Sequence, residues 1–175
     1  GGLVDGLLLE AVKLKELRRA GWSRVGLTSV ESVAAHAWGV SWLVIVLAPE
    51  GIDRLRALEI ALVHDLPEVR VGDITPHDGI PKSEKHTLER QAAYAMFAEQ
   101  PSLLDRWNEY QEGTTPEAVF VKDCDKLDMA IQATRYATAE AVDTAEFVTS
   151  ARDAIQTETI RLEFERLFGP RGCGV

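Results

Sequence analysis

The sequence has little that would suit an oxidising compartment or a membrane. Only two of its 175 residues are cysteines, Cys124 and Cys173, and their spacing matches neither a zinc motif nor a disulfide framework. No apolar run is long enough to span a bilayer. The short run at residues 7–9 lacks the length and the preceding basic residues of a signal peptide. We therefore expect a cytoplasmic protein that does not act at a membrane.

Positive charge is also scarce. The chain has 19 lysines and arginines against 28 acidic residues, a formal net charge of −9, and no basic cluster beyond Arg18 and Arg19. Because a protein that binds duplex nucleic acid needs a basic face, the composition argues against a nucleic-acid polymer as partner. A small anionic ligand would need local positive charge, which a bound metal with one or two arginines supplies.

Strand signals are nearly absent. No segment rich in valine, isoleucine and threonine alternates cleanly with polar residues between turns, and most apolar residues recur at helical spacing. The length and the 46% of hydrophobic residues suit one core. We therefore predict a single all-α domain over residues 1–175, with its core at about 14–168 and a short flexible tail at 169–175.

The expected helices begin and end at ordinary capping and breaking residues. Thr115 is predicted to cap a helix that has Pro116 at its first position. Helical spacing predicts buried positions at Leu55, Leu62 and Leu162, and the four tryptophans are expected to pack inside the protein. The expected helices cover about 4–20, 33–48, 53–65, 81–99, 101–110, 116–131 and beyond, and 145–168, with loops at 22–29 and 68–80.

One stretch, residues 60–75, carries most of the chemical signal. His64 and Asp65 end an apolar run, and Pro67 should break the helix that carries them, because it has no amide hydrogen to donate. Glu68 and Asp73 follow in the next segment. An imidazole and a carboxylate at a helix end suit a divalent cation, although a solvated helix terminus would look the same in sequence.

Two more candidates come from other helices. His36 borders the apolar stripe of its helix, and Asp125 shares a helix side with Val121. A buried carboxylate without a partner is costly, and a metal would stabilise it. The alternatives are a histidine at the core edge and a carboxylate paired with a neighbouring lysine. The candidate ligands are thus His36, His64, Asp65 and Asp125, a set that suits Mn, Co, Fe or Ni.

Four segments in this order, 14–22, 31–36, 64–76 and 121–129, resemble the HD-domain metal-dependent phosphohydrolases, and within them the 5'-deoxynucleotidase branch. The resemblance covers about residues 14–132. Two positions depart from the family pattern. Ala35 stands where an acid usually precedes the histidine, which could remove a contact that supports the metal ligand, and Pro67 stands where alanine or serine is common.

The resemblance implies an HD-domain bundle of about five to seven helices that hydrolyses deoxyribonucleoside 5'-monophosphates. It implies one divalent cation (Mn, Co, Fe, Ni, Mg or Zn) on His36, His64, Asp65 and Asp125, and a homodimer as an expectation. Glu68 and Asp73 would act as catalytic residues beside the metal. Arg19, Asp73, Ile74 and Thr75 would hold the nucleotide substrate. A second cation would bind Glu68, Asp73 and the carbonyl of Ile74.

Two other functions remain open at this level. Some HD-domain proteins are phosphodiesterases that act on cyclic or signalling nucleotides, and a helical interaction module could keep a metal only for stability. Glu68 and Asp73 argue against the second, because a structural metal site would not need them. His77 and His86 are further histidines that we expect at the surface.

Overall fold

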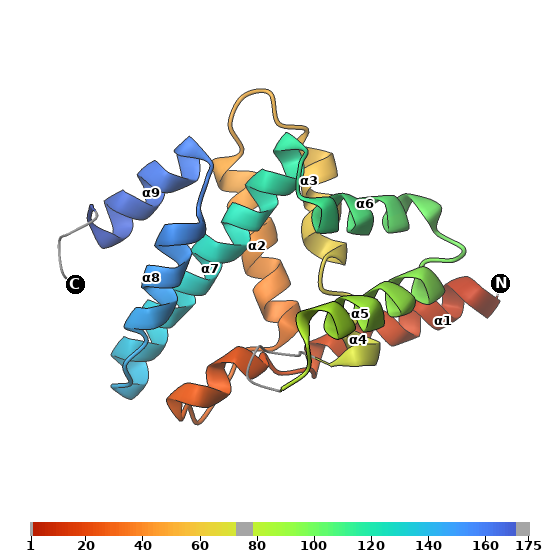
Figure 1. The fold of residues 1–175 in the computed structure, drawn as a ribbon, viewed down its shortest axis with the longest axis horizontal. Helices are drawn as coiled ribbons and strands as arrows, with labels where there is room; N and C mark the ends of the chain where they lie inside the picture. Colours follow the sequence, from red (N-terminus) through yellow and green to blue (C-terminus); the bar gives the residue numbers. More distant parts are fainter. Residues whose placement is uncertain (1, 73–78, 171–175) are drawn as a thin grey trace.

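The computed structural model describes residues 2–72 and 79–170, and these are helical apart from turns and one isolated bridge between Arg18 and Ser32 (Figure 1). The all-α prediction is confirmed. Within these ranges no helix is long and apolar enough to cross a bilayer. The elements are α1 (Gly2–Ala11), η1 (Val12–Lys15), η2 (Ala20–Val25), α2 (Val33–Leu47), α3 (Arg54–Val63), α4 (Glu68–Val71), α5 (Lys82–Met96), α6 (Pro101–Glu112), α7 (Pro116–Glu140), α8 (Ala145–Ala154) and α9 (Glu158–Phe168).

The core is built around α7, the longest helix, which packs against α2, α3, α6, α8 and α9 (Figure 1). Its side chains Phe120, Val121 and Leu127 meet Val40 of α2 and Ile60 of α3 in one fully buried cluster. Each such side chain contributes about 1.5–3 kcal/mol by leaving water. This cluster fixes α2, α3 and α7 relative to one another, and these helices or their ends carry all four predicted metal ligands.

Helix starts follow the capping residues. The Thr115 hydroxyl accepts a hydrogen bond from the Ala118 amide at the start of α7, which confirms the predicted cap. Ser32 caps α2 in the same way. Helix α3 ends at Val63, and Pro67 precedes the single turn of α4. The break predicted before Pro67 is therefore present, and it leaves His64 and Asp65 in a tight turn between two helices.

Two predicted helices are interrupted. The range 4–20 contains α1 and η1 and then leaves helical geometry, because backbone pairing joins the segment at Arg19 to the segment at Glu31. The range 145–168 is split into α8 and α9, because the buried Asp123 carboxylate of α7 accepts hydrogen bonds from the backbone amides of Gln156 and Thr157. The predicted loops are partly helical too, with η2 inside 22–29 and α4 inside 68–80.

Several apolar residues predicted to be buried are exposed. Leu55 and Leu62 on α3 are 67% and 58% exposed, because Ala57, Ile60 and Ala61 form the inward face instead. Leu162 is likewise exposed on α9. Of the tryptophans, Trp22 and Trp107 pack inside as expected, whereas Trp38 and Trp42 of α2 lie at the surface. A helix that is apolar on every side gives no periodic signal of which side faces inward.

Candidate metal centre

His64 is the C-cap residue of α3, where the chain turns out of the helix. Its ring is fully enclosed, and its Nδ1 lies 2.7 Å from the Ala61 carbonyl oxygen. Since a carbonyl can only accept, Nδ1 carries the proton and donates it there. The buried Nε2 atom faces the site and lies 3.2 Å from Oδ2 of Asp65. With the proton on Nδ1, Nε2 is the ring nitrogen that can bind a metal.

His36 projects from α2, and its ring, like that of His64, is held through Nδ1. Its Nδ1 lies 2.7 Å from Oδ2 of Asp128, and its buried Nε2 lies 2.6 Å from Oδ1 of Asp125. A carboxylate on the far ring nitrogen is the usual support of a metal-binding histidine, because it fixes the ring and raises its basicity. The His36 and His64 ring centroids are 6.2 Å apart, so the two Nε2 atoms converge from different helices.

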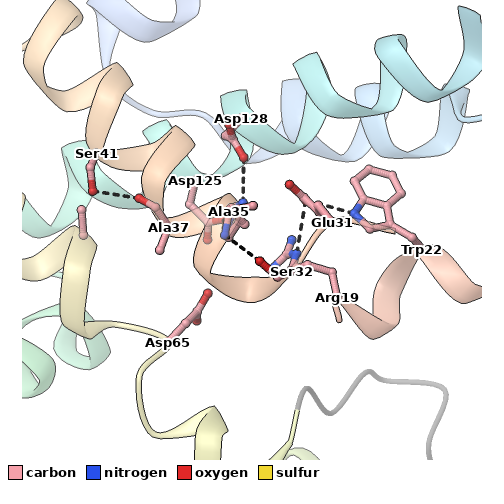
Figure 2. Close-up of polar contacts among 12 residues, drawn as sticks. Arg19, Trp22, Glu31, Ser32, Ala35, Ala37, Ser41, Asp65, Asp125 and Asp128 are labelled. Atoms are coloured by element: carbon pink, nitrogen blue, oxygen red, sulfur yellow. Dashed lines mark hydrogen bonds and ion pairs between the residues drawn. The ribbon is translucent and has the colours of Figure 1, made fainter. Parts of the chain in front are cut away.

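Two carboxylates complete the centre (Figure 2). Asp125 reaches from α7, and its Oδ2 accepts a hydrogen bond of 3.0 Å from the Tyr110 hydroxyl. Asp65 approaches from the turn after α3, with Oδ2 3.2 Å from His64 Nε2. Ligand atoms of His36, His64 and Asp65 lie within 4.8 Å of one another. Two buried imidazole nitrogens that face two carboxylates fit a divalent cation.

The electrostatics of the site favour bound positive charge. Burial and Arg19 lower the pKa of His36, but Asp125 and Asp128 outweigh them and raise it to about 10. Burial also raises the pKa of Asp65, yet the neighbouring His64 lowers it to about 2. The Asp65 and Asp125 carboxylates are therefore ionised at neutral pH and attract a cation at the point where the imidazoles meet.

A small cavity of about 170 Å³ opens beside this centre. Glu68, predicted as a catalytic residue, is buried and lines it together with His64 and Asp65. The opposite wall comes from α5 and α6, with Lys85 and Tyr110. The sequence offered no signal for these wall residues, because nothing local links α5 and α6 to the His-Asp turn.

Arg19, predicted to hold phosphate, does not line this cavity. It borders a separate surface cavity of about 510 Å³ formed by residues of the 18–30 segment. Its Nε lies 3.7 Å from Oε1 of Glu31, and its backbone amide donates to the Glu31 carbonyl (Figure 2). Burial raises the pKa of Asp125, but His36, His64 and, to a smaller extent, the charge of Arg19 hold it well below its usual value. Arg19 is thus near the centre but faces a different opening.

Some of the remaining residues singled out in the sequence lie in the described part of the chain and others do not. His86 lies at the surface, as expected. Ala35 is exposed, and the carboxylate that supports His36 comes from Asp128 on α7, so the family departure at position 35 leaves His36 with an acidic partner. Asp128 is three residues after Asp125, a spacing that puts both on one helix side. Asp73, Ile74, Thr75 and His77 lie outside the described residues, as does most of the predicted tail at 169–175.

An all-α fold in which two imidazoles and two carboxylates converge on one buried point defines a class of helical metal-binding proteins. Comparison with known proteins identifies the group within it. The chain belongs to the HD domain family, whose model matches residues 11–167.

Individual relatives agree with this assignment. The 5'-deoxynucleotidase HDDC2 of Dictyostelium discoideum is 39% identical over 137 residues, which cover 71% of this chain and 72% of that protein. The human 5'-deoxynucleotidase HDDC2 is 36% identical over 129 residues, a match that covers 71% of this chain and 63% of the human protein. The solved structure of a conserved hypothetical protein from Pyrococcus furiosus superposes with a TM-score of 0.80 at 32% identity, covering 93% of this chain and 97% of the other.

Proposed function

We propose that this protein is a metal-dependent phosphomonoesterase that hydrolyses deoxyribonucleoside 5'-monophosphates to deoxynucleoside and phosphate. The convergence of His36, His64, Asp65 and Asp125 beside a cavity carries the proposal. The relatives named 5'-deoxynucleotidase, which match most of the chain at 36–39% identity, support the substrate class. A phosphodiesterase or a purely structural metal site has no comparable support.

The four residues would hold one divalent cation. When bound, such a cation polarises a phosphoryl oxygen and lowers the pKa of a bound water toward neutrality. Its identity among Mn, Co, Fe, Ni, Mg and Zn is left open by the donor set, since imidazole and carboxylate suit several of these metals. A second cation on Glu68, Asp73 and the Ile74 carbonyl, a homodimer and a cytoplasmic setting also belong to this proposal.

Glu68 is the residue to which we assign the attacking water. It lines the cavity beside His64 and Asp65 from the first turn of α4. A carboxylate there can accept a hydrogen bond from water and take its proton as the oxygen attacks phosphorus. The P–O5' bond then breaks, and the 5'-oxygen leaves as the hydroxyl of the deoxynucleoside after taking up a proton. Asp73 would act in the same step.

Substrate binding is assigned to Arg19 together with Asp73, Ile74 and Thr75. A guanidinium is planar and matches two phosphate oxygens. Arg19 lies close enough to the centre to affect the pKa values of His36 and Asp125. A dianionic monophosphate would be drawn to this arginine and the cation, although the protein as a whole is acidic.

The test is phosphate release from a nucleotide panel by the metal-loaded enzyme. We expect deoxynucleoside 5'-monophosphates to be hydrolysed faster than 3'-monophosphates, cyclic nucleotides or diphosphates. Asp125→Ala should lose the bound metal and all phosphatase activity. Glu68→Ala should keep its metal and lose roughly 100-fold in turnover, the scale of an absent general base.

Each arm of the experiment can contradict the proposal. Cleavage of cyclic nucleotides without monophosphatase activity would favour a phosphodiesterase. Stoichiometric metal and normal turnover in Asp125→Ala would refute the four-ligand site. A Glu68→Ala enzyme with wild-type turnover would remove Glu68 from the mechanism, and loss of the metal in that variant would make Glu68 a ligand. Metal content is measured on the same samples used for kinetics.

A further inference from the structure

The inward side of α5 changes from apolar to charged where the helix reaches the candidate metal centre. Ala92 and Met96 are buried on this side, and the helical spacing of three and four residues continues back through Glu89 to Lys85. The Lys85 and Glu89 side chains are 32% and 17% exposed, whereas Leu88 between them lies at the surface. A surface helix normally turns leucine inward and charge outward, so this end of α5 reverses the usual pattern.

Helix stability does not explain this reversal. The Lys85 Nζ atom lies 3.7 Å from Oε1 of Glu89, but a lysine four residues before a glutamate is the less favourable order for a pair on a helix. Lys85 also ends the first turn of α5, where the helix dipole disfavours positive charge. Ion pairs that remain partly exposed contribute little to stability in any case. The reason for a lysine at this position therefore lies in what its side chain faces.

The Lys85 side chain lines the cavity of about 170 Å³ beside the candidate metal centre. Helix α5 packs against α4 (Figure 1), and the cavity that results is lined on its other wall by His64, Asp65 and Glu68. Lys85 is the only lysine or arginine among the described residues that line this cavity, and Arg19 borders a different opening. The cavity therefore places one ammonium group opposite the residues assigned to the metal and to the attacking water.

The two walls are close enough to act on one small group. Burial raises the pKa of the Glu89 carboxyl, Lys85 lowers it, and the charge of Asp65 raises it further. The α5 wall is therefore within electrostatic reach of a predicted metal ligand. The 3.7 Å between Lys85 Nζ and Glu89 Oε1 exceeds a normal hydrogen bond, so the ion pair is loose enough for the ammonium to approach a second anion.

We propose that Lys85 binds the phosphoryl group of the substrate inside this cavity. The inference rests on the proposed function and adds a substrate-binding residue to it. A phosphate monoester is close to dianionic at pH 7, and the lysine ammonium binds phosphate oxygens as a compact charge with three donors. In the transition state the charge spreads over the three equatorial phosphoryl oxygens. A lysine in a partly enclosed cavity stabilises that charge more strongly than it would in water.

The charges in the cavity call for such a group. Three carboxylates line it, those of Asp65, Glu68 and Glu89, and like charges at close range would repel a phosphoryl dianion. A metal held by Asp65 would offset the charge on that wall, and Lys85 offsets the charge of Glu89 on the other. Lys85 keeps its proton throughout, so water still forms the new P–O bond while the P–O5' bond breaks.

Calorimetric titration of inorganic phosphate into the cobalt-loaded protein measures the contact without any turnover. Lys85→Gln removes the charge, and its dissociation constant for phosphate should rise about 10-fold or more, the scale of a hydrogen bond to a charged group. Lys85→Arg keeps the charge and should lose less affinity. The matched control is Lys13→Gln, at an exposed position of η1, which removes the same charge and should leave phosphate affinity unchanged. Cobalt content and thermal unfolding should match the wild type in all three variants.

Hydrolysis of deoxyadenosine 5'-monophosphate separates this inference from the function on which it rests. In Lys85→Gln, kcat/KM should fall about 10- to 100-fold, again the scale of a hydrogen bond to a charged group. A metal-loaded wild type that hydrolyses no deoxynucleotide would refute the proposed function, and the phosphate titration would still decide whether Lys85 binds phosphate. An active wild type together with unchanged phosphate affinity in Lys85→Gln would overturn the inference alone. Equal losses in Lys85→Gln and Lys85→Arg would overturn it too, because the charge would then play no part.

Discussion

At the scale of single residues, the candidate metal centre depends on which group holds Nδ1, the ring nitrogen of each histidine that points away from the site. The two supports differ in chemistry, since His64 donates to the Ala61 backbone carbonyl and His36 contacts the side-chain carboxylate of Asp128. A charged acceptor strengthens the hydrogen bond and raises the basicity of the ring. His36 should therefore be the ligand whose affinity for the cation depends more on its outer partner.

Replacing Asp128 tests this dependence. Asp128→Asn keeps the size of the side chain and an acceptor oxygen but removes the charge, so metal affinity should fall about 10-fold or more. Competition titration of cobalt against a chelator measures the change, with helical content as a check on folding. Asp105→Asn, at an exposed position of α6, is the control and should leave affinity unchanged. Equal affinities in the two variants would mean that Asp128 does not support the ligand.

At the scale of elements, α2 and α7 approach closely where they carry the centre. Gly39 of α2 is buried, and a Cβ atom placed there would overlap the carboxylate of Asp128 on α7. Glycine is normally unfavourable inside a helix, by about 1 kcal/mol relative to alanine. Here its missing side chain leaves the room that Asp128 needs to reach His36.

Gly39→Ala should therefore destabilise the protein although alanine favours a helix. Overpacking typically costs about 1–3 kcal/mol, and a displaced Asp128 should also lower metal affinity. Thermal unfolding and the cobalt titration measure the two effects. Gly6→Ala in α1 is the matched control, because a Cβ at Gly6 meets nothing within 4 Å, and it should be neutral or stabilising. A Gly39→Ala protein as stable as the control, with unchanged metal affinity, would contradict the close approach.

At the scale of the whole molecule, one buried carboxylate joins three helices. Glu109 of α6 accepts hydrogen bonds from Arg56 of α3, Arg106 of its own helix and the Thr115 hydroxyl at the start of α7. Only 7% of the Glu109 surface is exposed, so water competes little with these donors for its carboxylate. The contact holds α6 beside α3 and α7, and α6 in turn brings Tyr110 to Asp125.

Glu109→Gln should lower the melting temperature by roughly 3–10 °C, because the new amide turns a donor toward groups that themselves donate and leaves one of them unpaired. Differential scanning calorimetry checks this. Glu163→Gln is the comparison, since Glu163 pairs with Arg166 on the surface of α9, where an ion pair adds little. Similar melting temperatures for the two variants would show that Glu109 does not tie the helices together.

The amino-acid sequence by itself determined the all-α class, the cap at Thr115, the break before Pro67, and the four candidate ligands. These follow from local rules, in which a proline, a cap or a spacing of three or four residues acts on its own helix. The ordered motifs also pointed to the family that the comparisons identify. The roles of the ligands, of Glu68 and of Arg19 stay predictions until the assays above are made.

Only the tertiary structure decided which side of each helix is buried and which residues stand behind the ligands. Trp38 and Leu62 look like core residues in sequence but are exposed, because α2 is apolar all round and α3 has more apolar positions than its inner side can bury. Asp128 meets His36 across 92 positions of chain. Such contacts depend on how α2, α3 and α7 pack, and packing is set by the shapes of many side chains together, which no local pattern records.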